Sequence, residues 1–207
     1  MKFEIWTIAY RKRKGNKTIL DDTSSPFKII PNSWRYWRAD PFAVDYQGKT
    51  WVFAEMYDRI LRRGVIGCCQ LNDEGATSWK VALKKPFHLS YPFIFEKNGL
   101  IYMVPETYMN NEIALYRANN FPYVWEQIKT IKADFCAVDS TLFSIEEENW
   151  MLSLHFSDQG EVLTLSVIDE EFNISNIIKI PLQSNNNIRP GGAIFSYNGK
   201  YIRPSQD

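Results

Sequence analysis

The stretch Asp40-Pro-Phe-Ala-Val-Asp-Tyr-Gln-Gly-Lys-Thr-Trp51 decides the fold, because its pattern occurs three more times along the chain. The matching stretches are Tyr91-Pro-Phe-Ile-Phe-Glu-Lys-Asn-Gly-Leu-Ile-Tyr102, Asp139-Ser-Thr-Leu-Phe-Ser-Ile-Glu-Glu-Glu-Asn-Trp150 and Gly191-Gly-Ala-Ile-Phe-Ser-Tyr-Asn-Gly-Lys-Tyr-Ile202. Their first residues lie 51, 48 and 52 positions apart. Each unit opens with a strand, a tight turn and an aromatic second strand, and the match holds over twelve positions in three of the four stretches. A period near 50 with this pattern is typical of a β-propeller with four-stranded blades.

The chain between these stretches has the same character. Short runs of Val, Ile, Phe, Tyr and Trp alternate with turn residues, and helical spacing is scarce. We therefore predict one all-β propeller-type domain over residues 1–207, with repeat units starting near residues 40, 91, 139 and 191. Five blades need roughly 250 residues at this period. The propeller is expected to be incomplete, with about three and a half blades plus N-terminal strands, and its open strand edges to be covered by another chain or by a second copy.

Composition excludes several classes of function. Lys plus Arg (24) balances Asp plus Glu (24), and the one basic block is Arg11 to Lys14, so nucleic-acid binding is not expected. No apolar stretch is long enough for a transmembrane segment, and no signal peptide is visible. Cys68, Cys69 and Cys136 lack disulfide or zinc spacing, which favours reduced thiols and a cytoplasmic location. Without a glycine-rich phosphate loop or metal-ligand spacing, we expect no cofactor and no metal.

Candidate site residues follow from blade geometry. The innermost strand of each blade lines a central channel, so the residues that open the repeat units are expected to face one funnel: Asp40, Tyr91, Asp139 and Gly191. Fifteen positions later a second ring is predicted, consisting of Glu55, Glu106, Leu154 with His155 beside it, and Gln206 with Asp207 beside it. Carboxylates that are distant in the sequence would thus converge in one cleft.

Several blocks carry a resemblance to a known family. They include Arg38-Ala-Asp-Pro-Phe42, His88-Leu-Ser-Tyr-Pro-Phe93, Tyr102-Met-Val-Pro-Glu106, Phe121-Pro-Tyr-Val-Trp125 and Arg203-Pro-Ser-Gln-Asp207. The chain resembles the N-terminal domain of the glucosamine inositolphosphorylceramide transferases from about Trp6 to its last residue. This resemblance implies a five-bladed propeller related to glycoside hydrolase family 43, and related bacterial domains accompany glycosyltransferase or formyltransferase modules.

The resemblance also implies catalytic roles. In the hydrolase relatives an Asp opening the first blade is the general base and an Asp opening the third tunes the acid; Asp40 and Asp139 match these positions. The acid, a Glu expected to open the fourth blade, has no counterpart, because residues 187–192 read Asn-Ile-Arg-Pro-Gly-Gly. Glycoside hydrolysis usually needs two carboxyl groups flanking the bond. Glu106 is the best remaining acid, with Glu55 as the other substitute.

The remaining candidates have two interpretations each. Arg189 and Arg203 would clamp a phosphate or a sugar acid, or would pair with the funnel carboxylates. His88 is either a site residue or a hydrogen-bonded loop histidine, and Tyr91 and Trp37 either stack on sugar rings or pack in the core. The predicted substrate-binding residues are Glu55, Tyr91, His88, Arg189, Arg203, Gln206 and Asp207.

Two functional hypotheses therefore stay open. The domain transfers or cleaves a glycosyl group in the funnel, or it holds a sugar or sugar phosphate there for an enzyme domain that is covalently attached or encoded alongside it. A propeller that only binds proteins is disfavoured, because an interior cluster of like charges is costly without a ligand.

Overall fold

Three four-stranded antiparallel sheets follow one another along the chain, each in the strand order of a propeller blade. The computed structural model describes residues 5–12, 15, 20–21, 25–133, 136–157, 160–180 and 189–206. Blade one contains β3 (Tyr36–Tyr46), β4 (Lys49–Asp58), β5 (Arg63–Leu71) and β6 (Lys80–Leu83). Blade two contains β7 (Ser90–Lys97), β8 (Leu100–Thr107), the 3-10 turn η1 (Tyr108–Asn110), β9 (Glu112–Asn120) and β10 (Val124–Ala133). Blade three contains β11 (Ala137–Ile145), β12 (Glu148–Ser157), β13 (Gly160–Ile168) and β14 (Ile174–Ile180).

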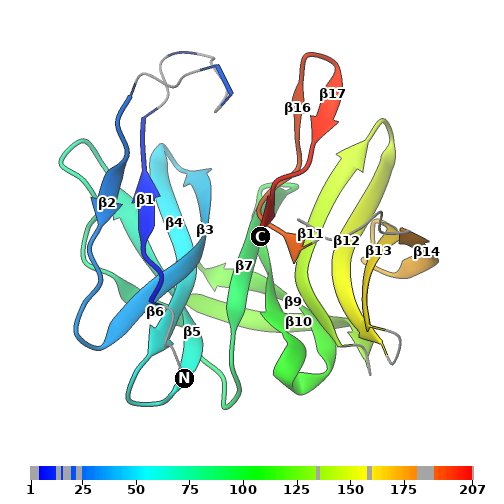
Figure 1. Cartoon of the computed structure of the whole chain (residues 1–207), viewed down its shortest axis with the longest axis horizontal. Helices are drawn as coiled ribbons and strands as arrows, with labels where there is room; N and C mark the ends of the chain where they lie inside the picture. Colours follow the sequence, from blue (N-terminus) through cyan, green and yellow to red (C-terminus); the bar gives the residue numbers. More distant parts are fainter. Residues whose placement is uncertain are drawn as a thin grey trace.

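Shorter strands flank the three blades. At the C-terminal side, β15 (Arg189–Pro190) pairs with β18 (Ser205–Gln206), and β16 (Phe195–Tyr197) pairs with β17 (Lys200–Ile202). These strands form the first hairpin of a fourth unit, which projects beyond the blades in Figure 1. At the N-terminal side, β1 (Ile8–Tyr10) pairs with β2 (Lys28–Ile30). The predicted fold class, an incomplete all-β propeller with N-terminal strands, is confirmed.

The core lies between the blades. Blades one and two enclose the largest apolar cluster, which includes Phe53 and Tyr116. Blades two and three enclose a second cluster around Leu115 and Met151. A third cluster, which includes Ile8, lies where β1 and β2 cover the other face of blade one. The central strands are apolar on both faces because both faces are buried, whereas the outermost strand β14 is mostly exposed.

The residues that open the first three units share an unusual backbone conformation. Asp40, Tyr91 and Asp139 have φ values of 50°, 41° and 53°. Each lies in a β-bulge, since the register between the first two strands of its blade shifts at this position. A left-handed non-glycine residue costs about 1 kcal/mol. Its recurrence at equivalent positions indicates that the bulges serve to aim these side chains, as bulges do near functional sites.

All three thiols are free; Cys68 and Cys69 are buried, and half-buried Cys136 contacts Asn111 through Sγ. Among the described residues, no helix has the length and apolar character that crossing a membrane requires.

Candidate functional site

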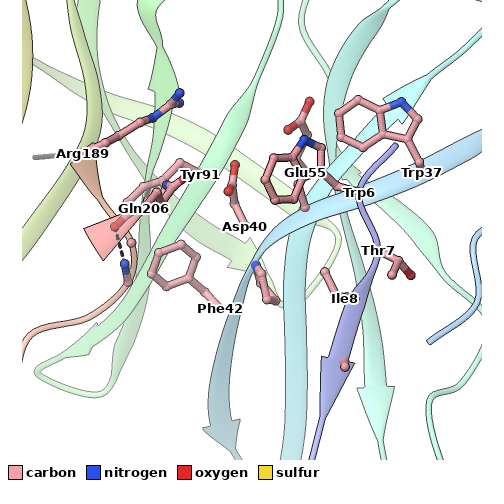
Figure 2. A pocket seen from close by; sticks show the side chains of 15 residues that line it. Trp6, Thr7, Ile8, Trp37, Asp40, Phe42, Glu55, Tyr91, Arg189 and Gln206 are labelled. Carbon is pink, nitrogen blue, oxygen red and sulfur yellow. Dashed lines mark hydrogen bonds between the residues drawn. The ribbon is translucent and has the colours of Figure 1, made fainter. Parts of the chain in front are cut away.

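A cavity of about 460 Å³ lies beside the first strand of blade one. Side chains from four parts of the chain line it: the N-terminal segment, blade one, blade two and the fourth unit. Figure 2 shows the Asp40 carboxyl near its centre, with Tyr91 and Arg189 on one side and Glu55 and Trp6 on the other. Residues far apart in the sequence therefore meet at one place, as the repeat pattern predicts.

The position of Asp40 at the bulge changes the acidity of its carboxyl group. Its pKa is raised to about 7, first by burial and then by the negative charges of Asp139 and Glu55. The Arg189 guanidinium and the Tyr91 backbone N–H, which donates to the carboxyl, oppose this shift. Near neutral pH the Asp40 side chain therefore exists in both forms and offers a hydrogen-bond donor as well as acceptors.

Glu55 is the second carboxyl of the cavity wall and is held from behind by His88. Its side chain is 7% exposed, and Oε1 lies 3.3 Å from His88 Nε2. The backbone N–H of Gly64 donates to His88 Nδ1 at 3.0 Å, which leaves the proton of a neutral imidazole on Nε2, facing Glu55. His88 is thus a supporting residue behind the wall and does not line the cavity.

Asp139 and Glu106 are held by Arg189. The Arg189 Nε donates to Asp139 Oδ2, and Nη2 lies 3.5 Å from Asp139 Oδ1 and 3.7 Å from Glu106 Oε2. Asp139 is fully buried and the Glu106 side chain is 10% exposed. Burial raises the pKa of both carboxyls, the charge of Asp139 adds to the shift at Glu106, and Arg189 opposes it at both. Asp139 takes the direct ion pair with Arg189, whereas Glu106 lies at a longer distance from the guanidinium.

This arrangement pairs Arg189 with the funnel carboxylates and leaves Arg189 in the cavity wall, so its role toward a ligand stays a prediction. It also separates the four candidate carboxyls into two sets. Asp40 and Glu55 line the cavity, whereas Asp139 and Glu106 lie behind Arg189 and are not part of its wall. The catalytic roles assigned to Asp40, Asp139 and Glu106 stay predictions.

Tyr91 braces the site across three units. Its hydroxyl lies 2.8 Å from Thr141 Oγ1 on blade three and accepts the backbone N–H of Gly192 at 2.9 Å (Figure 2). Its ring meets Phe42 of blade one edge to face, with 4.8 Å between the centroids. Tyr91 occupies the repeat position of Asp40 and Asp139, and there it joins the blades in place of a charge.

The fourth unit differs from the repeat pattern by one residue. Pro190 pairs with Ser205, so Ser205 takes the ring position of Glu55 and Glu106, and Gln206 lies opposite Arg189. The physical reason is an irregular segment that includes Gly192, where φ is 142°. Gln206 still lines the cavity and donates to the Pro190 carbonyl at 2.7 Å.

Two further predicted binding residues fall elsewhere. Arg203 is exposed between β17 and β18 and does not line the cavity. Asp207 lies outside the described residues.

Aromatic side chains form the wall opposite Tyr91. Trp37 lines the cavity and stacks on Tyr57 with 4.9 Å between ring centroids and 10° between planes. Trp6, which is 54% exposed, Thr7 and the β1 residues Ile8 and Ala9 extend this wall. The sequence analysis did not identify the N-terminal segment as part of the site, because that segment precedes the repeats and has no signal of its own.

The cavity can bind a polar ligand with apolar faces. Its carboxyls and amide would pair with hydroxyl groups, and its indole rings offer flat surfaces for C–H groups. Within the described ranges, no three His, Cys, Asp or Glu side chains are grouped so as to hold a metal ion.

Known folds resemble this arrangement. A GH43 β-xylosidase/α-arabinofuranosidase from a compost microbial metagenome, solved with xylotriose, matches with a TM-score of 0.61 at 14% identity, over 82% of this chain and 70% of that chain. An α-L-arabinofuranosidase from Podospora anserina, solved with cellotriose, matches with a TM-score of 0.60 at 17% identity, over 79% of this chain and 57% of that chain. At these identities the likeness shows the fold.

The sequence has closer relatives. Glucosamine inositolphosphorylceramide transferase 1 from Arabidopsis thaliana is 33% identical over 181 residues, which are 82% of this chain and 23% of that protein. The protein of the same name from Oryza sativa subsp. indica is 30% identical over 82% of this chain and 24% of its own length. The chain thus spans about a quarter of these relatives. The family described as glucosamine inositolphosphorylceramide transferase 1, N-terminal, matches residues 31–207, and the chain belongs to it.

Proposed function

We propose that this domain binds a carbohydrate, as a sugar or a sugar conjugate, in the cavity between Asp40 and Trp37. The observation that carries the proposal is the composition of that cavity, in which two carboxyls face two indole rings within about 460 Å³. Sugars need hydrogen-bond partners for their hydroxyl groups and a flat apolar surface for their C–H faces. A cavity in which Asp40, Glu55 and Trp37 stand on β-strands meets these needs at little entropic cost.

We further propose that the domain holds the sugar without cleaving it. Hydrolysis by the usual route requires two carboxyl groups on opposite sides of the scissile bond. Here Arg189 engages Asp139 and Glu106 away from the cavity, and Arg189 itself lies in the segment where the resemblance expects the acid. The two cavity carboxyls, Asp40 and Glu55, both come from blade one.

The relatives support a role beside an enzyme. The curated relatives are named as transferases, and this chain corresponds to about a quarter of their length. Two of the solved structures with this fold were determined with xylotriose and cellotriose. We propose that the domain presents a sugar or a sugar phosphate to a separate catalytic domain.

A second candidate function is glycosyl transfer or hydrolysis in the same cavity. It is favoured by the pKa of Asp40, which at about 7 suits a general base at neutral pH. Asp139 would orient the reacting groups, and Glu106, whose pKa is raised by burial, would be the acid once it reached the ligand. Asp40→Asn distinguishes the two functions, because it abolishes turnover of glycosides and sugar nucleotides only if the domain is catalytic.

A calorimetric screen tests the proposal. The folded domain is titrated with mono- and oligosaccharides and sugar phosphates chosen from a glycan array. Trp37→Ala is expected to weaken binding at least about tenfold, because it removes one aromatic wall. Trp34→Ala is the matched control, since Trp34 is 76% exposed and lies outside the cavity. A folded sample that binds no glycan, or equal losses in both variants, would contradict the proposal.

A further inference from the structure

The turn between β4 and β5 exposes an unusual set of side chains. Ile60 and Leu61 stand in solvent, 59% and 37% exposed, between the exposed arginines Arg59 and Arg62. Trp34, on the neighbouring turn, is 76% exposed. The two turns are joined, because the Arg59 backbone N–H donates to the Arg35 carbonyl at 3.0 Å. We call Trp34 together with residues 59–62 the basic tip.

The basic tip is preformed. Asp58, 1% exposed, accepts the backbone N–H groups of Ile60 and Leu61 through Oδ1, at 2.9 and 3.2 Å. Its other oxygen accepts two hydrogen bonds from Arg35, at 2.6 and 3.1 Å. These contacts fix the turn with its apolar side chains outward, so their exposure is built into the fold.

The charge of the basic tip is positive. The hydrogen bond from Arg35 lowers the pKa of Asp58 to about 2, and the oxygens of this carboxylate are already bound to Arg35 and to the backbone of the turn. No other carboxylate occurs in residues 33–37 or 59–64. In the part of the chain that the structure describes, no ion pair joins Arg59 or Arg62 to an acidic residue. Their guanidinium groups are available to an anionic partner.

We propose that the basic tip docks on the surface of an anionic lipid bilayer. Exposed aliphatic side chains and a tryptophan would enter the boundary between headgroups and acyl chains, while Arg59 and Arg62 would pair with lipid phosphates. Charge complementarity favours this partner, and so does size. Stable protein interfaces bury about 1,200 Å² or more, which a five-residue tip cannot supply, whereas interfacial insertion needs only a few apolar side chains.

Docking would orient the domain. The tip lies at the end of blade one opposite the β3–β4 turn, because β3, β4 and β5 are antiparallel neighbours (Figure 1). Glu55 lies three residues before Asp58 on β4. Trp37 stacks on Tyr57, the residue next to Asp58. The cavity wall and the tip therefore share the same end of blade one, and docking would hold the cavity near the headgroups. This inference is independent of the proposed function.

Vesicle co-sedimentation of the folded domain tests the inference. The wild type is expected to bind vesicles of phosphatidylcholine with phosphatidylserine, to bind pure phosphatidylcholine weakly, and to lose binding as salt rises. Arg59→Gln with Arg62→Gln should weaken binding about thirtyfold. Ile60→Ser with Leu61→Ser should weaken it at least about tenfold.

A matched control uses another exposed apolar pair. Ile177 and Ile178 on β14 are 45% and 50% exposed, and Ile177→Ser with Ile178→Ser should leave vesicle binding unchanged. The inference is overturned if the wild type ignores anionic vesicles, or if the tip variants bind as the wild type does. It is equally overturned if the tip variants only abolish self-association in sedimentation, which would make the tip a protein contact.

Discussion

The Arg189 guanidinium closes over the buried carboxylate of Asp139, with Nε donating to Oδ2 and Nη2 lying 3.5 Å from Oδ1. Asp139 opens blade three, and Arg189 belongs to the fourth unit, so this pair joins two units of the propeller. It also neutralises a charge that would otherwise stand beside Glu106 and Asp40 without compensation.

Replacing Arg189 by Met should destabilise the domain by about 2 to 3 kcal/mol, because buried Asp139 loses its ion-pair partner. This value is below that of a fully buried pair, since the Arg189 side chain is 46% exposed. Adding Asp139→Asn should restore at least half of the loss. Urea unfolding of the three proteins measures both effects. If the double variant is no more stable than the single one, the two side chains do not form an energetic pair.

Asp40→Asn should change how stability depends on pH. The folded pKa of about 7 lies above the ordinary value of 3.8, so the contribution of Asp40 to stability is fully present below about pH 4 and is lost as the pH rises through 7. The amide does not ionise, and the variant should gain about 2 to 4 kcal/mol relative to the wild type between pH 4 and 8. Unfolding midpoints across this range measure the difference. Asp45→Asn, at an exposed position on the same strand, controls for the effect of the amide itself. If the stability difference between Asp40→Asn and the wild type does not change with pH, the account is contradicted.

Gly64→Ala should displace Glu55. A Cβ at this position would lie 2.2 Å from the Leu89 carbonyl oxygen, 2.8 Å from Glu55 Oε1 and 3.0 Å from His88 Cε1. The backbone contact cannot relax by a side-chain rotation, so we expect a loss of about 2 kcal/mol or more in unfolding free energy together with weaker ligand binding. Gly99→Asn, at an open hairpin position, should cost under about 1 kcal/mol. Similar losses at both glycines would show that Gly64 has no special role.

Tyr91→Phe isolates the brace between the units. It removes a buried hydroxyl with partners on Thr141 and Gly192, which should cost about 1 to 2 kcal/mol. Tyr102→Phe is the control, because the Tyr102 ring also packs against aromatic rings, those of Phe95 and Phe172. Thermal unfolding compares the two variants. If both have the same melting temperature, the hydroxyl contacts of Tyr91 do not contribute to stability.

The sequence predicts the fold well because the repeat is expressed in local chemistry. The turn residues Gln47-Gly48 and Asn98-Gly99 end each first strand at the same distance from Asp40 and Tyr91, and these turns recur in the structure. Tight turns and alternating apolar residues act over a few positions, so they can be recognised without knowledge of the tertiary structure.

The site is less predictable, because it depends on contacts between units. Asp40, Glu55, Tyr91 and Gln206, which blade geometry places at the funnel, line the cavity together with Arg189. Asp139 and Glu106 lie behind Arg189 and do not line the cavity. This arrangement depends on the path of the fourth unit, which has an irregular segment where the other units have a single bulge. The contribution of Trp6 depends on how the N-terminal strand packs, and no periodic signal encodes that packing.

The most direct test of the central claim is a saturation-transfer NMR measurement on the best glycan from the screen, which reports binding and cleavage in one sample. The account predicts saturation transfer to the sugar C–H protons in the wild type and in Trp34→Ala, a clear reduction of it in Trp37→Ala, and unchanged anomeric signals after prolonged incubation. Absence of saturation transfer, or a new reducing-end signal that disappears in Asp40→Asn, would contradict it.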